Sequence, residues 1–546
     1  TCVSTTCRSS AWTRIERVDE VILDFSSSLH IVWALLPEIV VAVTGLVVLM
    51  LDVFQRGSRS APSAPWVGPL AITGLVGAVL ANAWLLTLEV PAQNAQIAVD
   101  GFRIAMNFIV LGVAIFGLLY SFDWLNREGQ FTGEFIFLVL MAVVGMMLLG
   151  GTRDLIVLFV AIELMSISVY VLTGYDRRSR RSAEAALKYF LMGAFASGFL
   201  LYGIALIFGS VGSTNLSLVT SEIALGTASN NPMLFAGVAL LLVGFAFKVS
   251  AVPFHMWTPD AYEGAPTPVT GFMAAGVKAA GFAAIVRFIT IELAPAAEFW
   301  EGIIWWLAML TMIVPNLAAL AQDDVKRMLA YSSIAHAGYL LVGVAADSPL
   351  GRSATLFYLA VYAAMTLGSF AIVYLVAGKG DVRSKLSDFR GLGWRRPLLG
   401  AAFVVFLLSL AGFPPTGGFI GKLYLLSAAV ESGESVLAIT LVLTSLISYY
   451  YYLRVIWKMY FEEAPESLPT PERPGLAFGF AASIGALALL VAGLFPGHGL
   501  RTASRAGEDL VPRAAVVAPG AAPSARPSGQ DPAASRASSN VSEPER

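Results

Sequence analysis

The chain has 546 residues, of which 57% are hydrophobic and 13% are charged, and its mean hydropathy is +0.73. This composition is typical of a polytopic membrane protein in a lipid bilayer and leaves little chain for a soluble domain. The formal net charge of −2 excludes a polybasic nucleic-acid binder. Two cysteines, Cys2 and Cys7, are too few for an iron–sulfur cluster, and no dinucleotide fingerprint is present, so we expect no cofactor or metal in this chain.

The predicted elements are about fourteen apolar stretches, each near the roughly 20 residues that cross a bilayer as a helix. The first seven run 29–51, 66–88, 102–122, 135–150, 155–173, 185–208 and 233–253. The other seven run 267–293, 305–320, 332–345, 354–375, 398–430 with an interruption, 436–460 and 476–495. The first stretch has no small-residue cleavage site, so we interpret it as a retained span. The sequence therefore predicts an all-α membrane protein.

Lysine and arginine concentrate in alternate loops, namely those between helices 1–2, 3–4, 5–6, 9–10, 11–12 and 13–14. The opposite loops hold only Arg153 and Arg352. Because basic loops stay in the cytoplasm, this asymmetry predicts that both termini lie on the outer side.

Two helices are interrupted, helix 7 near Pro253 and helix 12 near Pro414, Pro415, Gly417 and Gly418. Broken helices in corresponding positions indicate a transporter built from repeats, and a five-helix repeat must be inverted. We expect repeats at 131–293 (helices 4–8) and 294–460 (helices 9–13), after helices 1–3 at 29–130. Residues 461–497 hold a loop and helix 14. The polar segment 1–28 and the Pro, Ala and Ser-rich tail 498–546 are expected to be loose or disordered. A bundle without repeats is the alternative.

Charged residues stand inside the predicted spans: Glu163, Lys188, Lys248, Lys278 and Lys422. Each costs about 2.5–3.5 kcal/mol at the middle of a bilayer, so such residues usually face a protein interior or a wet cavity. A static ion pair or snorkelling explains any one of them. The set favours a proton relay, because lysine can release its proton when buried and arginine cannot.

Glu163 and Lys188 lie on adjacent antiparallel helices, so we expect them to form a pair whose separation acts as a switch. Near Pro414 we expect unpaired carbonyls and water that joins Lys422 to Lys278, with His336 in the chain. The alternative is a packing kink beside an ordinary buried lysine.

The remaining polar candidates carry weaker signals. His255 and His336 suit proton hand-off, although a lone histidine on an apolar face is more often a satisfied core residue, and two on separate helices form no metal site. Asp260 and Glu263 are expected as loop carboxylates at the cytoplasmic mouth. The role of Glu38, near the outer end of helix 1, is open.

Three strings carry a family resemblance: FKVSAVPFHMWTPDAYEGAPTPVTGFMA, QDDVKRMLAYSSIAHAGYLLVG and AGFPPTGGFIGK. They resemble the antiporter-like membrane subunits of type I NADH:quinone oxidoreductase, respiratory complex I. The chain looks most like the subunit N group, because Lys422 stands where subunit M typically has a glutamate. The tail also offers no counterpart of the long lateral helix typical of subunit L.

The resemblance implies a subunit of a bacterial inner-membrane complex that contacts other membrane subunits, including related antiporter-like ones. It implies a Glu163–Lys188 pair, a central Lys278, an exit-side Lys422 and Lys248 on broken helix 7. FMN, iron–sulfur clusters, NADH and a quinone would be bound by other subunits, and their redox reaction would drive proton export through this one. Subunits of multi-chain Na⁺/H⁺ antiporters or membrane-bound hydrogenases are rivals, and a structural subunit that transports nothing is a third.

Overall fold

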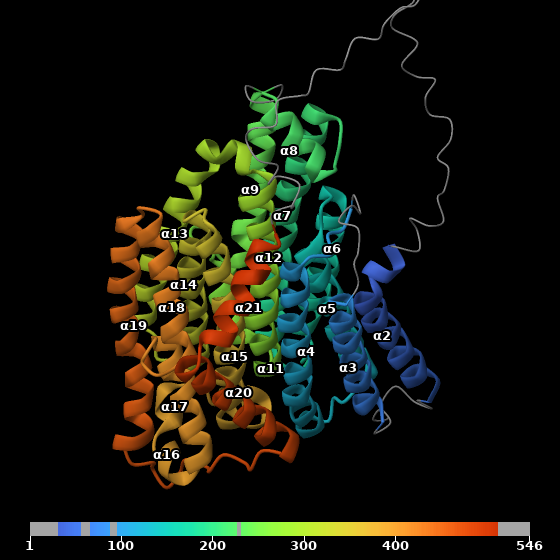
Figure 1. The fold of residues 1–546 in the computed structure, drawn as a ribbon. Helices are drawn as coiled ribbons and strands as arrows, with labels where there is room; N and C mark the ends of the chain where they lie inside the picture. The colour runs from blue at the N-terminus through green and yellow to red at the C-terminus, as the bar shows by residue number, and fades with distance from the viewer. Residues whose placement is uncertain (1–30, 56–65, 88–95, 227–230, 511–546) are drawn as a thin grey trace, which may run out of the picture. The chain divides into compact units, whose positions relative to one another are not determined.

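The computed structural model describes residues 31–55, 66–87, 96–226 and 231–510. Helices run side by side through these ranges, which contain isolated β-bridges but no strand (Figure 1). Thirteen helical spans in the described residues are long and apolar enough to cross a membrane. The broken pair α17 (Pro397–Ala411) and α18 (Gly417–Glu431) adds a fourteenth crossing. The prediction of an all-α multi-pass membrane protein is therefore confirmed, whereas Cys2, Cys7 and segment 1–28 lie outside the described residues.

The first three crossings pack side by side, the first on the second and the second on the third. They are α2 (Leu36–Gln55), α3 (Val67–Leu85) and α4 (Gly101–Glu128). The Asp100 carboxylate accepts a hydrogen bond from the Arg103 amide and caps the start of α4, and Gly129 ends the helix in a left-handed conformation.

The next group of helices corresponds to the predicted first repeat. It comprises α5 (Gly133–Gly151), α6 (Leu155–Thr173), α7 (Arg180–Val211), the short α8 (Leu216–Ala224), α9 (Pro232–Val249), α10 (Trp257–Gly264), α11 (Thr267–Phe272) and α12 (Lys278–Arg287). Two π-helical segments, Met273–Val277 and Phe288–Glu292, flank α12. Helix 7 is thus broken between α9 and α10, as the sequence predicted.

The second group comprises α13 (Ala297–Leu320), α14 (Val325–Ala345), α15 (Pro349–Ala377), the one-turn α16 (Leu392–Arg395), α17, α18 and α19 (Ser435–Phe461). Short 3-10 turns occupy Ala294–Ala296, Lys379–Asp381 and Leu386–Phe389. The chain then forms α20 (Leu476–Leu494) and α21 (Gly497–Glu508).

The two groups share a hydrogen-bond pattern at the start of their second helices. Asp154 caps α6, accepts a hydrogen bond from the Thr214 hydroxyl and forms a β-bridge with Asn215. Asp324 caps α14, accepts from the Ser384 hydroxyl and forms a bridge with Lys385. Because α6 and α14 are five crossings apart, the pattern recurs on opposite sides of the membrane. The fold therefore contains two inverted five-helix repeats.

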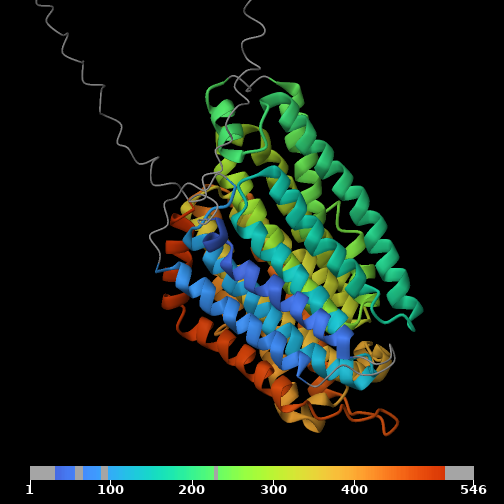
Figure 2. The same cartoon turned by 90° about the vertical axis from the view of Figure 1, so that its right-hand side faces the viewer.

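The helices of the centre differ from those of the edge in burial. In the most apolar part of the crossing 267–292 all residues are buried, and the corresponding shares in α14 and α15 are 89% each. In contrast, α7 is 39% buried and lies at the edge of the bundle (Figure 2). A site on the central helices is thus shielded from lipid, whereas a site on α7 is exposed on the outside of the bundle.

The expectation that everything after residue 498 is disordered is wrong for the first part of that tail. Residues 497–508 form α21, which packs on α15 and α4 and buries Ala503, Ala506 and Gly507. Composition did not reveal this helix because small residues bury little area by themselves and need a neighbouring surface. Residues 511–546 lie outside the described residues.

A close approach of α7 and α9 depends on glycine. A Cβ atom at Gly203 would lie 2.7 Å from the carbonyl oxygen of Gly237, whereas one at Gly198 on the same helix meets no atom within 4 Å. We expect Gly203→Leu to destabilise the packed helices by about 1–3 kcal/mol, because the backbones must separate. Thermal unfolding of the purified complex should show a lower Tm for Gly203→Leu than for the control Gly198→Leu. Equal Tm values would contradict this packing.

Candidate functional site

Three lysines of the predicted set are buried in the interior: Lys248 on α9, Lys278 at the start of α12, and Lys422 on α18. Their side chains are 4%, 1% and 6% exposed, so their ammonium groups cannot reach an interface by snorkelling. Each ammonium group donates hydrogen bonds to uncharged oxygen atoms of neighbouring helices.

Lys248 lies one residue before the end of α9. Ser250, with a φ of 63°, turns the chain there, and the prolyl segment that follows prevents the helix from continuing. The Lys248 ammonium donates to the Ser166 hydroxyl at 2.7 Å and to the Tyr170 hydroxyl at 3.3 Å, both on α6. Glu163 lies on the same helix α6, one turn before Ser166.

Lys278 follows directly on the π-helical segment Met273–Val277. Its ammonium donates to the backbone carbonyl of Ser333 and, at 2.6 Å, to the Ser333 hydroxyl on α14. The hydroxyl of Tyr362 on α15 donates to the same Ser333 oxygen at 2.7 Å, and its ring lies 5.8 Å from the Lys278 nitrogen. Lys278 therefore contacts both of the most buried helices of the second repeat.

Lys422 lies in the second half of broken helix 12. Its ammonium donates to the carbonyl of Ala411 at 2.9 Å, which is the last residue of α17, and lies 4.8 Å from the centre of the Tyr339 ring. The cation thus stands at the negative end of a half-helix.

We expected unpaired carbonyls at this break, but protein donors reach two of those next to Pro414. The Gly412 carbonyl accepts from the Tyr449 hydroxyl at 2.9 Å, and the Phe413 carbonyl accepts from the Thr416 amide and hydroxyl. Side chains, including Lys422 itself, replace the missing helical hydrogen bonds.

The expected contact between Glu163 and Lys188 is not formed in this structure. Lys188 forms ion pairs with Glu184 at 2.8 Å and with Asp260 at 3.0 Å, and it is 47% exposed. Glu163 instead accepts a hydrogen bond from the Ser197 hydroxyl. Glu163 and Lys188 lie at different depths in the bundle. Asp260 on α10 lies at the depth of Lys188 and forms the ion pair instead.

A charged cluster joins the two repeats at the level of Lys188. Asp260 and Glu263 lie on α10, not on a loop as expected, and the Arg327 guanidinium of α14 bonds to them at 2.9 and 2.7 Å. Partial burial raises the pKa of the Asp260 carboxyl, but hydrogen bonds and charges from Lys188 and Arg327 outweigh this effect and hold the pKa below its usual value. A cavity of about 270 Å³ opens among these side chains.

The two histidines have different surroundings. His336 is 1% exposed, and both of its ring nitrogens contact tyrosine hydroxyls. Its ring lies 5.4 Å from the Tyr362 ring, which is next to Lys278, and 5.4 Å from the Tyr339 ring, which is next to Lys422. His255 lies in the turn after Pro253, and its Nδ1 atom is buried without a hydrogen-bond partner among the described residues. His336 is thus hydrogen-bonded to side chains of two neighbouring helices, Tyr358 and Tyr452.

Sequence reasoning missed several polar residues that the fold brings inside. Ser166, Tyr170 and Ser333, which hold the lysines, have no charge and so gave no signal. Two arginines were also overlooked, Arg103, which pairs with Glu38 at 2.7 Å, and Arg287, which pairs with Asp100 at 2.8 Å. Both arginines lie near helix ends, where charged residues are common, so the sequence analysis did not select them. Each nevertheless stands beside an apolar run, and that position could have been noticed. The first pair assigns Glu38 an ionic partner on α4.

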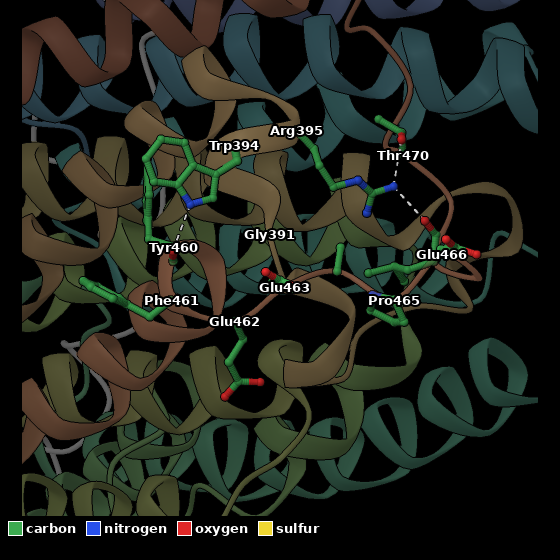
Figure 3. A pocket seen from close by; sticks show the side chains of 12 residues that line it. Gly391, Trp394, Arg395, Tyr460, Phe461, Glu462, Glu463, Pro465, Glu466 and Thr470 are labelled. Atoms are coloured by element: carbon green, nitrogen blue, oxygen red, sulfur yellow. Dashed lines mark hydrogen bonds between the residues drawn. The ribbon is translucent and has the colours of Figure 1, made fainter.

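A larger cavity is separate from the lysines. It measures about 840 Å³ and lies between α16 and the segment after α19, and its lining includes Trp394, Arg395, Glu462 and Glu466 (Figure 3). Arg395 bonds to the Leu468 carbonyl and the Thr470 hydroxyl. None of the buried lysines lines this cavity, so its size does not identify the functional site.

Comparison with known proteins finds relatives of the same membrane family in both sequence and fold. The family model described as "NADH:quinone oxidoreductase/Mrp antiporter, TM" matches residues 152–448. NADH-quinone oxidoreductase subunit N of Trichlorobacter lovleyi is 47% identical over 432 residues, which cover 79% of this chain and 88% of that relative. A chain of respiratory complex I from Thermus thermophilus has a TM-score of 0.71 at 37% identity and covers 86% of this chain and 99% of its own length.

A chain of the Mrp complex from Dietzia sp. has a TM-score of 0.75 at 24% identity, covering 88% of this chain and 97% of that one. This second likeness concerns the fold alone, so sequence identity, and not the fold, separates the rival groups. The chain belongs to the NADH:quinone oxidoreductase/Mrp antiporter membrane family and, within it, to the subunit N group of NADH-quinone oxidoreductases.

Proposed function

We propose that this chain translocates protons, and that NADH oxidation and quinone reduction in other subunits of a complex drive the transport. The observation that carries the proposal is the row of three buried lysines, Lys248, Lys278 and Lys422, held by hydroxyl and carbonyl oxygens. The redox cofactors, FMN and iron–sulfur clusters, belong to other subunits in this proposal.

Neutral ligands favour transport over a purely structural role. A buried ammonium without a bonded carboxylate is costly, and a static core would gain from replacing it with an apolar side chain. The same surroundings allow lysine to exist as a neutral amine, since hydroxyl and carbonyl oxygens do not fix the proton as strongly as a carboxylate does. Each site can therefore accept a proton and release it.

The positions of Glu163 and Lys188 suggest how release is controlled. In this structure Lys188 is bound to Asp260 and Glu184, so the charge of Glu163 is available to stabilise protonated Lys248. If Lys188 moves from Asp260 to Glu163, that stabilisation falls and Lys248 passes its proton toward Lys278. Arg327 remains to neutralise Asp260 after Lys188 departs.

The route continues toward α18. Lys278 and Lys422 are separated by His336 and a group of buried tyrosines, and Lys422 faces the end of half-helix α17. Deprotonated Lys422 is the acceptor for a proton from Lys278, and protonated Lys422 releases it toward the outer face.

The proposed location is the inner membrane of a bacterium, with the basic loops in the cytoplasm and both termini outside. The Lys188–Asp260–Arg327 cluster lies near the starts of α7 and α14, which follow basic or cytoplasmic loops in this orientation. It would form the cytoplasmic entrance.

Polar groups on the outer surface of the bundle support the expectation that other membrane subunits bind this chain. Glu163 and Ser197 are half-buried on α6 and α7, at membrane depth. A carboxylate exposed to hydrocarbon is unfavourable, so another membrane subunit is expected to cover this face.

Removal of the central charge tests the proposal. We expect Lys278→Met and Lys278→Arg both to abolish NADH-driven proton uptake in membrane vesicles, because methionine carries no proton and arginine does not release one. Lys379→Met, which alters an exposed lysine, is the control. Normal pumping by Lys278→Arg would show that only the charge matters, and sodium-dependent transport without NADH would favour the antiporter group.

Removal of either member of the proposed switch tests coupling. Glu163→Gln and Lys188→Ala should lower NADH-driven pumping while the complex still assembles, because the field at Lys248 no longer changes. Electron transfer should slow as well, since a blocked pump holds back its driving reaction. Glu301→Gln, at an exposed position, is the control. The switch is refuted if both variants pump like this control.

A further inference from the structure

The cavity of about 840 Å³ beside α16 lies where two crossings end on the same side of the bundle. Helix α19 ends at Phe461, and α17 begins at Pro397, directly after α16. Large apolar side chains are exposed here: Trp394 by 73%, Phe461 by 69% and Leu398 by 88%. Tryptophan at the end of a crossing is typical of the membrane–water interface. The cavity therefore opens at the level of lipid headgroups.

The acidic side of the cavity has capacity for a cation. Glu462 is already held in ion pairs by two basic neighbours. Glu463 and Glu466 also line the cavity, and neither forms an ion pair within the described part of the chain. The rings of Trp394 and Phe461 belong to the same lining, and aromatic faces attract ammonium groups (Figure 3).

The basic side has capacity for an anion. Three guanidinium groups donate to oxygen atoms of the segment 468–471: Arg395 at 2.7 Å, Arg396 at 3.0 Å and Arg383 at 3.5 Å. These oxygens are carbonyls and a hydroxyl, and none of the three arginines pairs with a carboxylate among the residues that the structure describes. Burial and the like charges of Arg383 and Arg396 lower the pKa of the Arg395 guanidinium. A phosphate would relieve this repulsion and accept charge-assisted hydrogen bonds.

We propose that this cavity binds a phospholipid whose headgroup carries both a phosphate and a primary ammonium group, as phosphatidylethanolamine does. The phosphate binds at Arg395, and the ammonium group binds at Glu463 and Glu466. The acyl chains then run along the exposed apolar side chains at the start of α17 and the end of α19. A basic protein segment would satisfy the carboxylates but would be repelled by the arginines, so the zwitterionic headgroup matches the lining better.

Photolabelling of the intact complex tests this assignment. The complex is placed in nanodiscs of phosphatidylcholine that contain phosphatidylethanolamine or phosphatidylglycerol with a photoreactive acyl chain, and labelled peptides are identified by mass spectrometry. Residues 391–398 and 457–470 should be labelled about three- to fivefold more by the ethanolamine lipid, because the glycerol lipid has no ammonium group to pair with the exposed carboxylates.

Variants separate the two halves of the headgroup. Glu463→Gln combined with Glu466→Gln should lower labelling by the ethanolamine lipid to the level of the glycerol lipid, and Glu472→Gln, exposed on the same segment but outside the cavity, is the control. Arg395→Gln should lower labelling by both lipids, with Arg473→Gln as control, and glutamine keeps an N–H donor for the Leu468 carbonyl.

Labelling of α2, whose outward face is also exposed, reports whether each variant still assembles and provides the reference signal. Equal labelling of the cavity by the two lipids, or an unchanged signal in the double glutamate variant, would overturn the proposal in favour of lipid that merely surrounds the bundle. Absence of label from these peptides would overturn it too, and would show that a partner subunit covers the cavity.

A soluble headgroup distinguishes a lipid from a small phosphate ester. Phosphoethanolamine at the concentration of the photoreactive lipid should leave labelling unchanged, because it has no acyl chains to contact Leu398 and Phe461. Equally effective competition would overturn the lipid assignment.

Discussion

The structure depends on one constraint: an ammonium group buried in an apolar bundle must receive oxygen ligands from the protein itself. Lys248, Lys278 and Lys422 meet it with hydroxyl groups and backbone carbonyls. For Lys422 the ligand exists because helix 12 is broken, which frees the Ala411 carbonyl. The break therefore supplies a ligand for the charge, and the charge supplies a donor for the break.

The inverted repeats place these charges along one path. Asp154 and Asp324 fix the starts of α6 and α14 by the same hydrogen bonds at opposite ends of the bundle. The most buried crossings, 267–292 and α14, then meet where Lys278 binds Ser333. Lys278 thus joins the two repeats at this junction, whereas either repeat alone would hold only part of the row of lysines.

Hydrogen bonds to uncharged groups and ion pairs hold the charged side chains in different regions of the bundle. Interior lysines are held by hydroxyl and carbonyl oxygens, while Lys188 and Arg327 are held by carboxylates near the bundle surface. The arginines Arg103 and Arg287 form buried pairs that tie α4 to α2 and α12. Arginine suits such fixed contacts because it keeps its proton, and lysine suits the relay because it does not.

Sequence alone determined the membrane class, the crossings, both helix breaks and the charged residues, because hydropathy, proline and isolated charges are local signals. It also indicated the repeats, whose shared aspartate caps appeared only in the folded chain. The partner of Lys188, the ligands of the buried lysines, the tyrosines around His336 and helix α21 were decided by tertiary structure. The partner of Lys188 depends on which carboxylate lies at its depth once the helices pack. The other features depend on uncharged or small side chains of distant segments, and the sequence pattern does not distinguish these residues until packing brings them together.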